Sequence, residues 1–163
     1  MESSNAVAAL IDAIPGEVRD RIEVLWGKQK GGFALLLGHM LDTAAVAEQI
    51  WDHYASTALR SRIEEAAGHP NTGRQFFAFA CGIHDVGKAT PSFQRQVTHL
   101  WDNVKSAGLD ASPLLRSSNA ARHSDAGGRI AHDLLLKAGW SDDAAGWVCR
   151  SFPRTLSQRP HHA

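Results

Sequence analysis

The sequence predicts an all-α protein, a compact helical bundle. Apolar residues recur at helical spacing along almost the whole chain, and no segment shows the alternation of apolar and polar residues that is typical of a half-buried strand. Glycine- and proline-containing breaks separate these segments. With 163 residues, of which 44% are hydrophobic, the chain can bury one core, so we expect a single domain over residues 1–163.

The expected helices follow one another with short breaks. Pro15 suits the first turn of the second helix, and Thr90-Pro91 is typical of a helix cap followed by a first turn. Gly31-Gly32 indicates a break between two helices. We expect helices over residues 5–14, 15–26, 35–54, 58–67, 74–85, 90–106, 123–138 and 142–150, with loops over residues 68–73 and 108–119. The helical body then covers residues 1–150, and residues 151–163 form an irregular tail.

One expected helix, over residues 90–106, carries an apolar stripe. Its members recur at helical spacing and should face the core: Phe93, Val97, Leu100, Trp101 and Val104. Such a stripe indicates core packing rather than a cofactor site.

Composition sets limits on the function. Lysine plus arginine and aspartate plus glutamate both total 17, so no global positive field indicates nucleic acid, and any such contact must be local. The two cysteines, Cys81 and Cys149, match neither a disulfide framework nor a zinc spacing. The sequence shows no signal peptide and no apolar run of membrane-spanning length. We therefore expect a protein of the reducing cytoplasm, without a membrane partner.

The most informative stretch is Gly82-Ile83-His84-Asp85-Val86-Gly87-Lys88, at the end of an apolar run. An imidazole and a carboxylate on consecutive residues can face one divalent metal ion where the backbone turns, and Gly82 and Gly87 allow close approach there. Lys88, one helical turn beyond His84, should share its face and suits a phosphate. The alternative is a helix end with a solvated acid and a capping histidine.

Further histidines occupy positions suited to the same site. His39 projects from an otherwise packed helix, although alone it would more often be a satisfied core histidine. His123 opens a later helix, and His161-His162 stand next to the end of the sequence. We expect His39, His84 and Asp85 to lie within about 5 Å of one another on the inner face of the bundle, with Lys88 at the rim.

The order of these motifs resembles the HD superfamily of metal-dependent phosphohydrolases, and within it the HD nuclease domain of the type I CRISPR-associated nuclease-helicase. The resemblance covers about residues 25–147. It rests on Trp26-Gly27-Lys28, on Gly38-His39-Met40-Leu41-Asp42, on His84-Asp85-Val86-Gly87-Lys88 with its continuation Ala89-Thr90-Pro91-Ser92-Phe93-Gln94, and on Arg122-His123.

The resemblance implies hydrolysis of single-stranded DNA at one or two divalent transition metal ions, such as manganese, iron, cobalt or nickel. It implies that His39 and His84 bind one ion, that Asp85 is the catalytic bridge, and that His123, with His161 and His162, binds the other ion. Lys88 would hold a substrate phosphate, with Arg95 and Arg122 as further DNA contacts. The implied partners are the CRISPR surveillance complex and a helicase portion, separately encoded or missing, because the chain has no phosphate-binding glycine loop.

The tail departs from the family pattern. Pro153 and Pro160 bar a continuous helix, and the family's downstream aspartate has no counterpart in this sequence. The sequence therefore looks like the amino-terminal part of the nuclease domain, naturally short or cut. We expect His161 and His162 not to reach the cluster in the isolated chain, which would leave at most one well-bound ion and impaired activity.

Two other functions stay open. An HD phosphohydrolase acting on nucleotides would use the same His39, His84 and Asp85, and preference for a mononucleotide over DNA would favour it. A non-catalytic HD-like module docking on the CRISPR surveillance complex would bind that complex without holding a metal ion.

Overall fold

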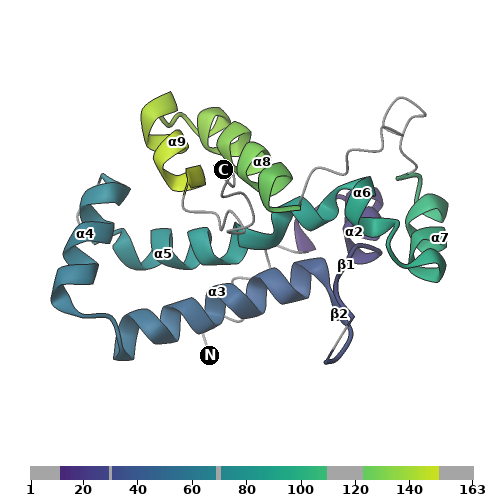
Figure 1. The fold of residues 1–163 in the computed structure, drawn as a ribbon, viewed down its shortest axis with the longest axis horizontal. Coiled ribbons are helices and arrows are strands. Elements are labelled where there is room, and N and C mark those ends of the chain that lie inside the picture. Colours follow the sequence, from purple (N-terminus) through teal and green to yellow (C-terminus); the bar gives the residue numbers. More distant parts are fainter. Residues whose placement is uncertain (1–11, 30, 69–70, 110–122, 151–163) are drawn as a thin grey trace, which may run out of the picture.

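The computed structural model describes residues 12–29, 31–68, 71–109 and 123–150 (Figure 1). The expected all-α bundle is confirmed apart from one small sheet. The helices are α2 (Gly16–Glu23), α3 (Leu36–His53), α4 (Thr57–Ala67), α5 (Gly73–Gly82), the 3₁₀ helix η1 (Ile83–Ala89), α6 (Pro91–Gln94), α7 (Thr98–Ser106), α8 (His123–Lys137) and α9 (Asp142–Arg150). None of the helices in these ranges is long and apolar enough to cross a membrane. The expected tail over residues 151–163 and most of the expected helix over residues 5–14 lie outside the described residues.

The small sheet was not predicted. Strands β1 (Trp26–Lys28) and β2 (Ala34–Leu35) pair antiparallel, so the expectation of a helix through Trp26 is wrong. Helix α2 ends at Glu23, and the backbone N–H of Trp26 donates to the side chain of Gln94 instead of continuing a helix. A long-range hydrogen bond of this kind leaves no local signal in the sequence.

The long helices α3 and α5 lie side by side and run in opposite directions, with α4 at one end (Figure 1). Gly82 permits their close approach near the site, because a side-chain carbon there would lie 3.2 Å from Ala44 Cβ and 3.3 Å from the Met40 carbonyl oxygen. At the other end of the pair, Arg74 on α5 forms ion pairs with Glu48 and Asp52 on α3. Gly82 is the last residue of α5, so this close approach to α3 lies directly before η1.

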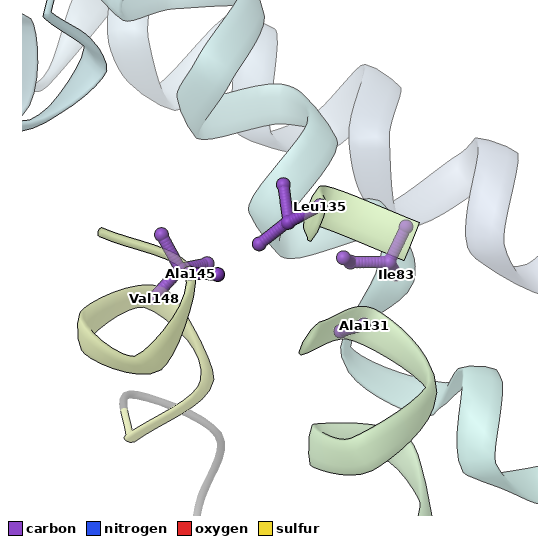
Figure 2. Packing of buried hydrophobic residues seen from close by; sticks show 5 residues of the cluster. All are labelled: Ile83, Ala131, Leu135, Ala145 and Val148. Carbon is purple, nitrogen blue, oxygen red and sulfur yellow. The ribbon is translucent and has the colours of Figure 1, made fainter. Parts of the chain in front are cut away.

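Helix α8 packs against η1, and α9 packs against α8. The buried cluster behind the site joins all three elements and is shown in Figure 2: Ile83, Ala131, Leu135, Ala145 and Val148. Ile83 comes directly before the His-Asp pair, so its burial anchors the first turn of η1. Ala131 is fully buried, which lets the α8 backbone come close to η1.

The segment predicted as one helix over residues 90–106 is two helices. Pro91 opens α6 as expected, but Val97 adopts an extended conformation between α6 and α7. The break follows Gln94, whose side chain is tied to β1 and to the Lys88 carbonyl. Phe93 and Val104 are buried as predicted, whereas the other three members of the stripe are only half-buried.

Candidate metal centre

The site is built around one carboxylate oxygen. Asp85 Oδ2 lies 3.0 Å from His39 Nε2, 3.0 Å from His84 Nε2 and 2.7 Å from Lys88 Nζ. His39 comes from α3, and the other three residues come from η1. The expected cluster of His39, His84 and Asp85 therefore forms, and residues 45 positions apart in sequence meet in it.

The 3₁₀ conformation of η1 determines which side chains share a face. In a 3₁₀ helix, residues three apart in sequence are aligned, whereas an α-helix aligns residues three and four apart. Lys88 consequently pairs with Asp85, three residues earlier. Lys88 and His84 both face Asp85 Oδ2, but the expected place of Lys88 at the rim is corrected, because its side chain is only 15% exposed.

The orientation of His84 is fixed by the backbone before it. Its Nδ1 lies 2.7 Å from the Cys81 carbonyl oxygen, which can only accept, so the ring proton sits on Nδ1. A neutral His84 then presents the lone pair of Nε2 to a carboxylate oxygen 3.0 Å away. Two acceptors this close need a proton or a metal cation between them, which is the arrangement expected of a metal ligand oriented by a second hydrogen bond.

The donor atoms fit a divalent transition metal. One atom each from His39, His84 and Asp85 lies within 4.8 Å of the others. Two imidazole nitrogens and one carboxylate oxygen suit manganese, iron, cobalt or nickel better than magnesium, which prefers oxygen ligands. Three protein ligands leave coordination positions for water or a substrate oxygen.

His123 lies on the other side of the carboxylate. Its Nε2 is 3.9 Å from Asp85 Oδ1, too far for a hydrogen bond, and its side chain is 43% exposed. Its ring packs edge to face on Phe93, with centroids 5.5 Å apart. His123 thus borders the site without joining the three-residue cluster, next to the oxygen that the other histidines leave free.

Of the four remaining predicted site residues, the structure describes Arg95. Arg95 lies over the ring of Trp101, with its Cζ atom 4.9 Å from the ring centroid. Arg122, His161 and His162 lie outside the described residues. The structure therefore brings together three of the predicted metal ligands with Lys88, and His123 borders them.

Electrostatics favour an ionised Asp85. Burial of the carboxyl opposes its ionisation, but the hydrogen bond from Lys88, the charge of Lys88 and the hydrogen bond with His39 outweigh burial, so the pKa of Asp85 lies below its ordinary value. The site therefore offers a metal ion a carboxylate and not a carboxylic acid.

Gln94 supports the site, a role that its place at the end of the family-like motif did not specify. Its side chain is fully buried, it accepts from the backbone N–H of Trp26, and it donates to the carbonyls of Trp26 and Lys88. The Trp26 indole donates in turn to the Gln94 carbonyl. A glutamine two residues after the Thr90-Pro91-Ser92 turn would ordinarily be expected at the surface. Its burial and its hydrogen bonds in the structure show that it connects β1 to η1.

Phe93 is the second supporting residue. Its ring lies 4.5 Å from that of Trp26 and 5.5 Å from that of His123, between centroids, and the Lys88 ammonium is 5.6 Å from its centroid. One apolar side chain thus packs against β1, the start of α8 and the cation of the site.

Comparisons with known proteins agree with this site. Residues 26–157 match the family model described as "Cas3, HD domain". The chain is 38% identical over 99 residues to a CRISPR-associated endonuclease/helicase Cas3 of Thermus thermophilus, covering 60% of this chain and 11% of that protein. It is 31% identical over 125 residues to a CRISPR-associated nuclease/helicase Cas3 of Streptococcus thermophilus, covering 68% and 13%. The chain thus spans only a small part of these relatives, and no solved structure matches it.

Proposed function

Because the chain belongs to the Cas3 HD domain family, we propose that it is a metal-dependent nuclease domain of type I CRISPR interference, which cleaves single-stranded DNA by hydrolysing phosphodiester bonds. The observation that supports this most strongly is the convergence of His39 Nε2 and His84 Nε2 on Asp85 Oδ2. A buried carboxylate between two imidazoles is well suited to hold a metal ion at which phosphate esters are hydrolysed.

In this proposal, His39, His84 and Asp85 hold one divalent transition metal ion. A bound ion supplies a water of lowered pKa and positive charge beside the phosphate. The Cys81 carbonyl orients His84 by accepting a hydrogen bond from its Nδ1. Lys88, whose ammonium lies beside Asp85, would bind a phosphate oxygen. Asp85 Oδ1, which faces His123, is the oxygen through which Asp85 would reach a second ion. The family pattern would add His161 and His162 as ligands of that ion, but we expect them not to reach it in this chain.

Arg95 and Arg122 are the proposed DNA contacts beyond the site. Arg95 is half-buried on Trp101, a pairing of cation and aromatic ring that also suits a single strand, because bases stack on aromatic side chains and guanidinium groups. The proposed partners are the CRISPR surveillance complex and a helicase portion. Both curated relatives are named as combined nuclease and helicase proteins, and this chain spans 11% and 13% of them.

The experiment that tests the proposal is a nicking assay on circular single-stranded DNA with manganese, cobalt, nickel or magnesium. The transition metals should support cleavage, magnesium should support less, and Asp85→Asn should abolish it, because an amide of the same size cannot replace the charged ligand. Asp102→Asn is the matched control, since Asp102 pairs with Lys105 at the same spacing and the same 2.7 Å on an exposed surface.

Asp102→Asn should keep full activity. Cleavage that survives in Asp85→Asn would contradict the proposal, and faster hydrolysis of mononucleotides than of DNA under the same conditions would assign the site to a nucleotide phosphohydrolase instead.

A further inference from the structure

The Lys88 ammonium is paired with Asp85 Oδ2, the same oxygen atom that would bind a metal ion. Its Nζ lies 2.7 Å from Asp85 Oδ2, and it is this oxygen that lies 3.0 Å from both imidazole Nε2 atoms. An ion held by both imidazoles and Asp85 would bind Oδ2 at about 2.0–2.2 Å. An ammonium 2.7 Å from the same oxygen could be no more than about 5 Å from that ion. The two positive charges would therefore repel each other in a site this buried.

Lys88 has other partners that would remain if it left Asp85. The ammonium donates to the Gly27 carbonyl at 2.9 Å, and it lies 5.6 Å from the centroid of the Phe93 ring. Both partners belong to the wall formed by β1 and α6, whereas the imidazoles come from α3 and the start of η1. The ammonium can therefore move away from Oδ2 and stay bonded on its own side of the site.

We propose that Lys88 competes with the metal ion for Asp85 Oδ2: it neutralises the carboxylate in the metal-free protein, and metal binding displaces it. The inference rests on the proposed function, because it takes His39, His84 and Asp85 as metal ligands. It adds that Lys88 lowers the metal affinity of the site while it stabilises the metal-free fold. The Lys88 ammonium becomes available to bind a phosphate only after a metal ion has displaced it from Asp85. Phosphate binding is thereby coupled to metal binding.

The test is the Kd for Mn²⁺, measured by isothermal titration calorimetry on chelator-treated wild-type protein and on Lys88→Met, which keeps most of the length of the side chain without its charge. The variant should bind Mn²⁺ about tenfold more tightly or better, a change of about 1.4 kcal/mol per factor of ten. Lys105→Met is the matched control, because Lys105 pairs with Asp102 at the same 2.7 Å and the same three-residue spacing but outside the site. It should leave the Kd unchanged.

Thermal unfolding gives a second readout that does not depend on activity. Without metal, Lys88→Met should melt below the wild type, because a buried carboxylate loses its counter-ion. With saturating Mn²⁺ the melting temperature should rise by more in the variant than in the wild type, since tighter binding to the folded state stabilises it more. If Lys88→Met does not fold, Lys88→Gln, whose amide can still donate to the Gly27 carbonyl, serves in its place.

The outcomes separate this inference from the proposed function. If the wild type binds Mn²⁺ and the Lys88 variant binds it no more tightly, the competition is overturned while the metal site stands. If neither protein binds Mn²⁺, the metal site and the competition are both overturned.

Discussion

Gly87 and the His123 carbonyl lie so close that a side-chain carbon on Gly87 would overlap the carbonyl oxygen. The same missing side chain admits the backbone nitrogen of Gly127, one turn further along α8, and a side-chain carbon on Gly127 would in turn lie 3.2 Å from the Gly87 nitrogen. Helix α8 and η1 therefore touch backbone to backbone, and this contact places the His123 imidazole opposite Asp85 Oδ1.

Gly87→Ala should force α8 away from η1. We expect a loss of about 3 kcal/mol or more in the free energy of unfolding, since the methyl group meets backbone that cannot rotate aside. Urea denaturation measures the loss. Gly38→Ala is the control: Gly38 precedes His39 on α3 and an added carbon there meets nothing within 4 Å, so it should stabilise the protein by about 0.5–1 kcal/mol. Equal stabilities for the two variants would contradict the close contact.

Gln94 should be as important to stability as a large core residue. Gln94→Ala would leave the buried N–H and C=O of Trp26 without their side-chain partner, and we expect a cost of about 2–4 kcal/mol. Gln94→Glu keeps the size but turns an acceptor toward the carbonyls of Trp26 and Lys88.

The glutamate variant should regain stability as the pH falls, because only the protonated acid can donate to those carbonyls. Its pKa in the folded protein would be raised, so the penalty should be full above that pKa and should fade as pH drops through it. A denaturation series between pH 7 and pH 4 would show this. A Gln94→Glu penalty that does not change with pH would contradict the assigned hydrogen bonds.

The ion pair between Arg74 and Asp52 should stabilise the protein less as the pH falls, which is the opposite of the pH dependence expected for the Gln94→Glu variant. The hydrogen bond from Arg74 holds the pKa of Asp52 below its ordinary value, so the pair contributes stability at neutral pH that is lost as the pH falls through this lowered pKa. Asp52→Asn should therefore lower the melting temperature at pH 7 and have a smaller effect at about pH 3. A melting-temperature difference that stays constant between these two pH values would show that the pair contributes no charge-dependent stability.

Local patterns predicted most of the helices and much of the site. The positions of His39, His84 and Asp85 followed from one short motif and an upstream helix, and Gly82 and Gly87 proved to be points of close approach as expected. What the sequence could not show are the interactions between distant segments. Trp26 pairs with Leu35 in the small sheet, and its backbone N–H and C=O bond to the side chain of Gln94, 68 residues later.

The conformation of η1 illustrates the same limit. The apolar pattern before the turn that follows Gly82 fits either an α or a 3₁₀ conformation, and the three-residue spacing of Asp85 and Lys88 is compatible with both. The observed 3₁₀ turn places α8 against Gly87 and turns Lys88 toward Asp85. Tertiary packing therefore decided a detail that propensity leaves open.

The tail histidines give a further prediction. Because Pro153 and Pro160 bar a continuous helix, we expect the double variant His161→Ala/His162→Ala to keep the metal stoichiometry and Mn²⁺ affinity of the unmodified chain. Inductively coupled plasma mass spectrometry on dialysed protein measures the stoichiometry, and His39→Ala serves as the control that should lose the ion. Loss of a tightly bound second ion in the double variant would show that the tail histidines are ligands and that the chain carries a two-ion site.

The central claim, that His39, His84 and Asp85 hold one metal ion, is tested most directly by the anomalous scattering of crystals grown with Co²⁺. The claim predicts an anomalous peak about 2.0–2.2 Å from His39 Nε2, His84 Nε2 and Asp85 Oδ2, with the Lys88 ammonium displaced from that oxygen toward the Gly27 carbonyl. Saturating Co²⁺ that gives no peak between these three side chains, with Lys88 still bonded to Asp85, would contradict it.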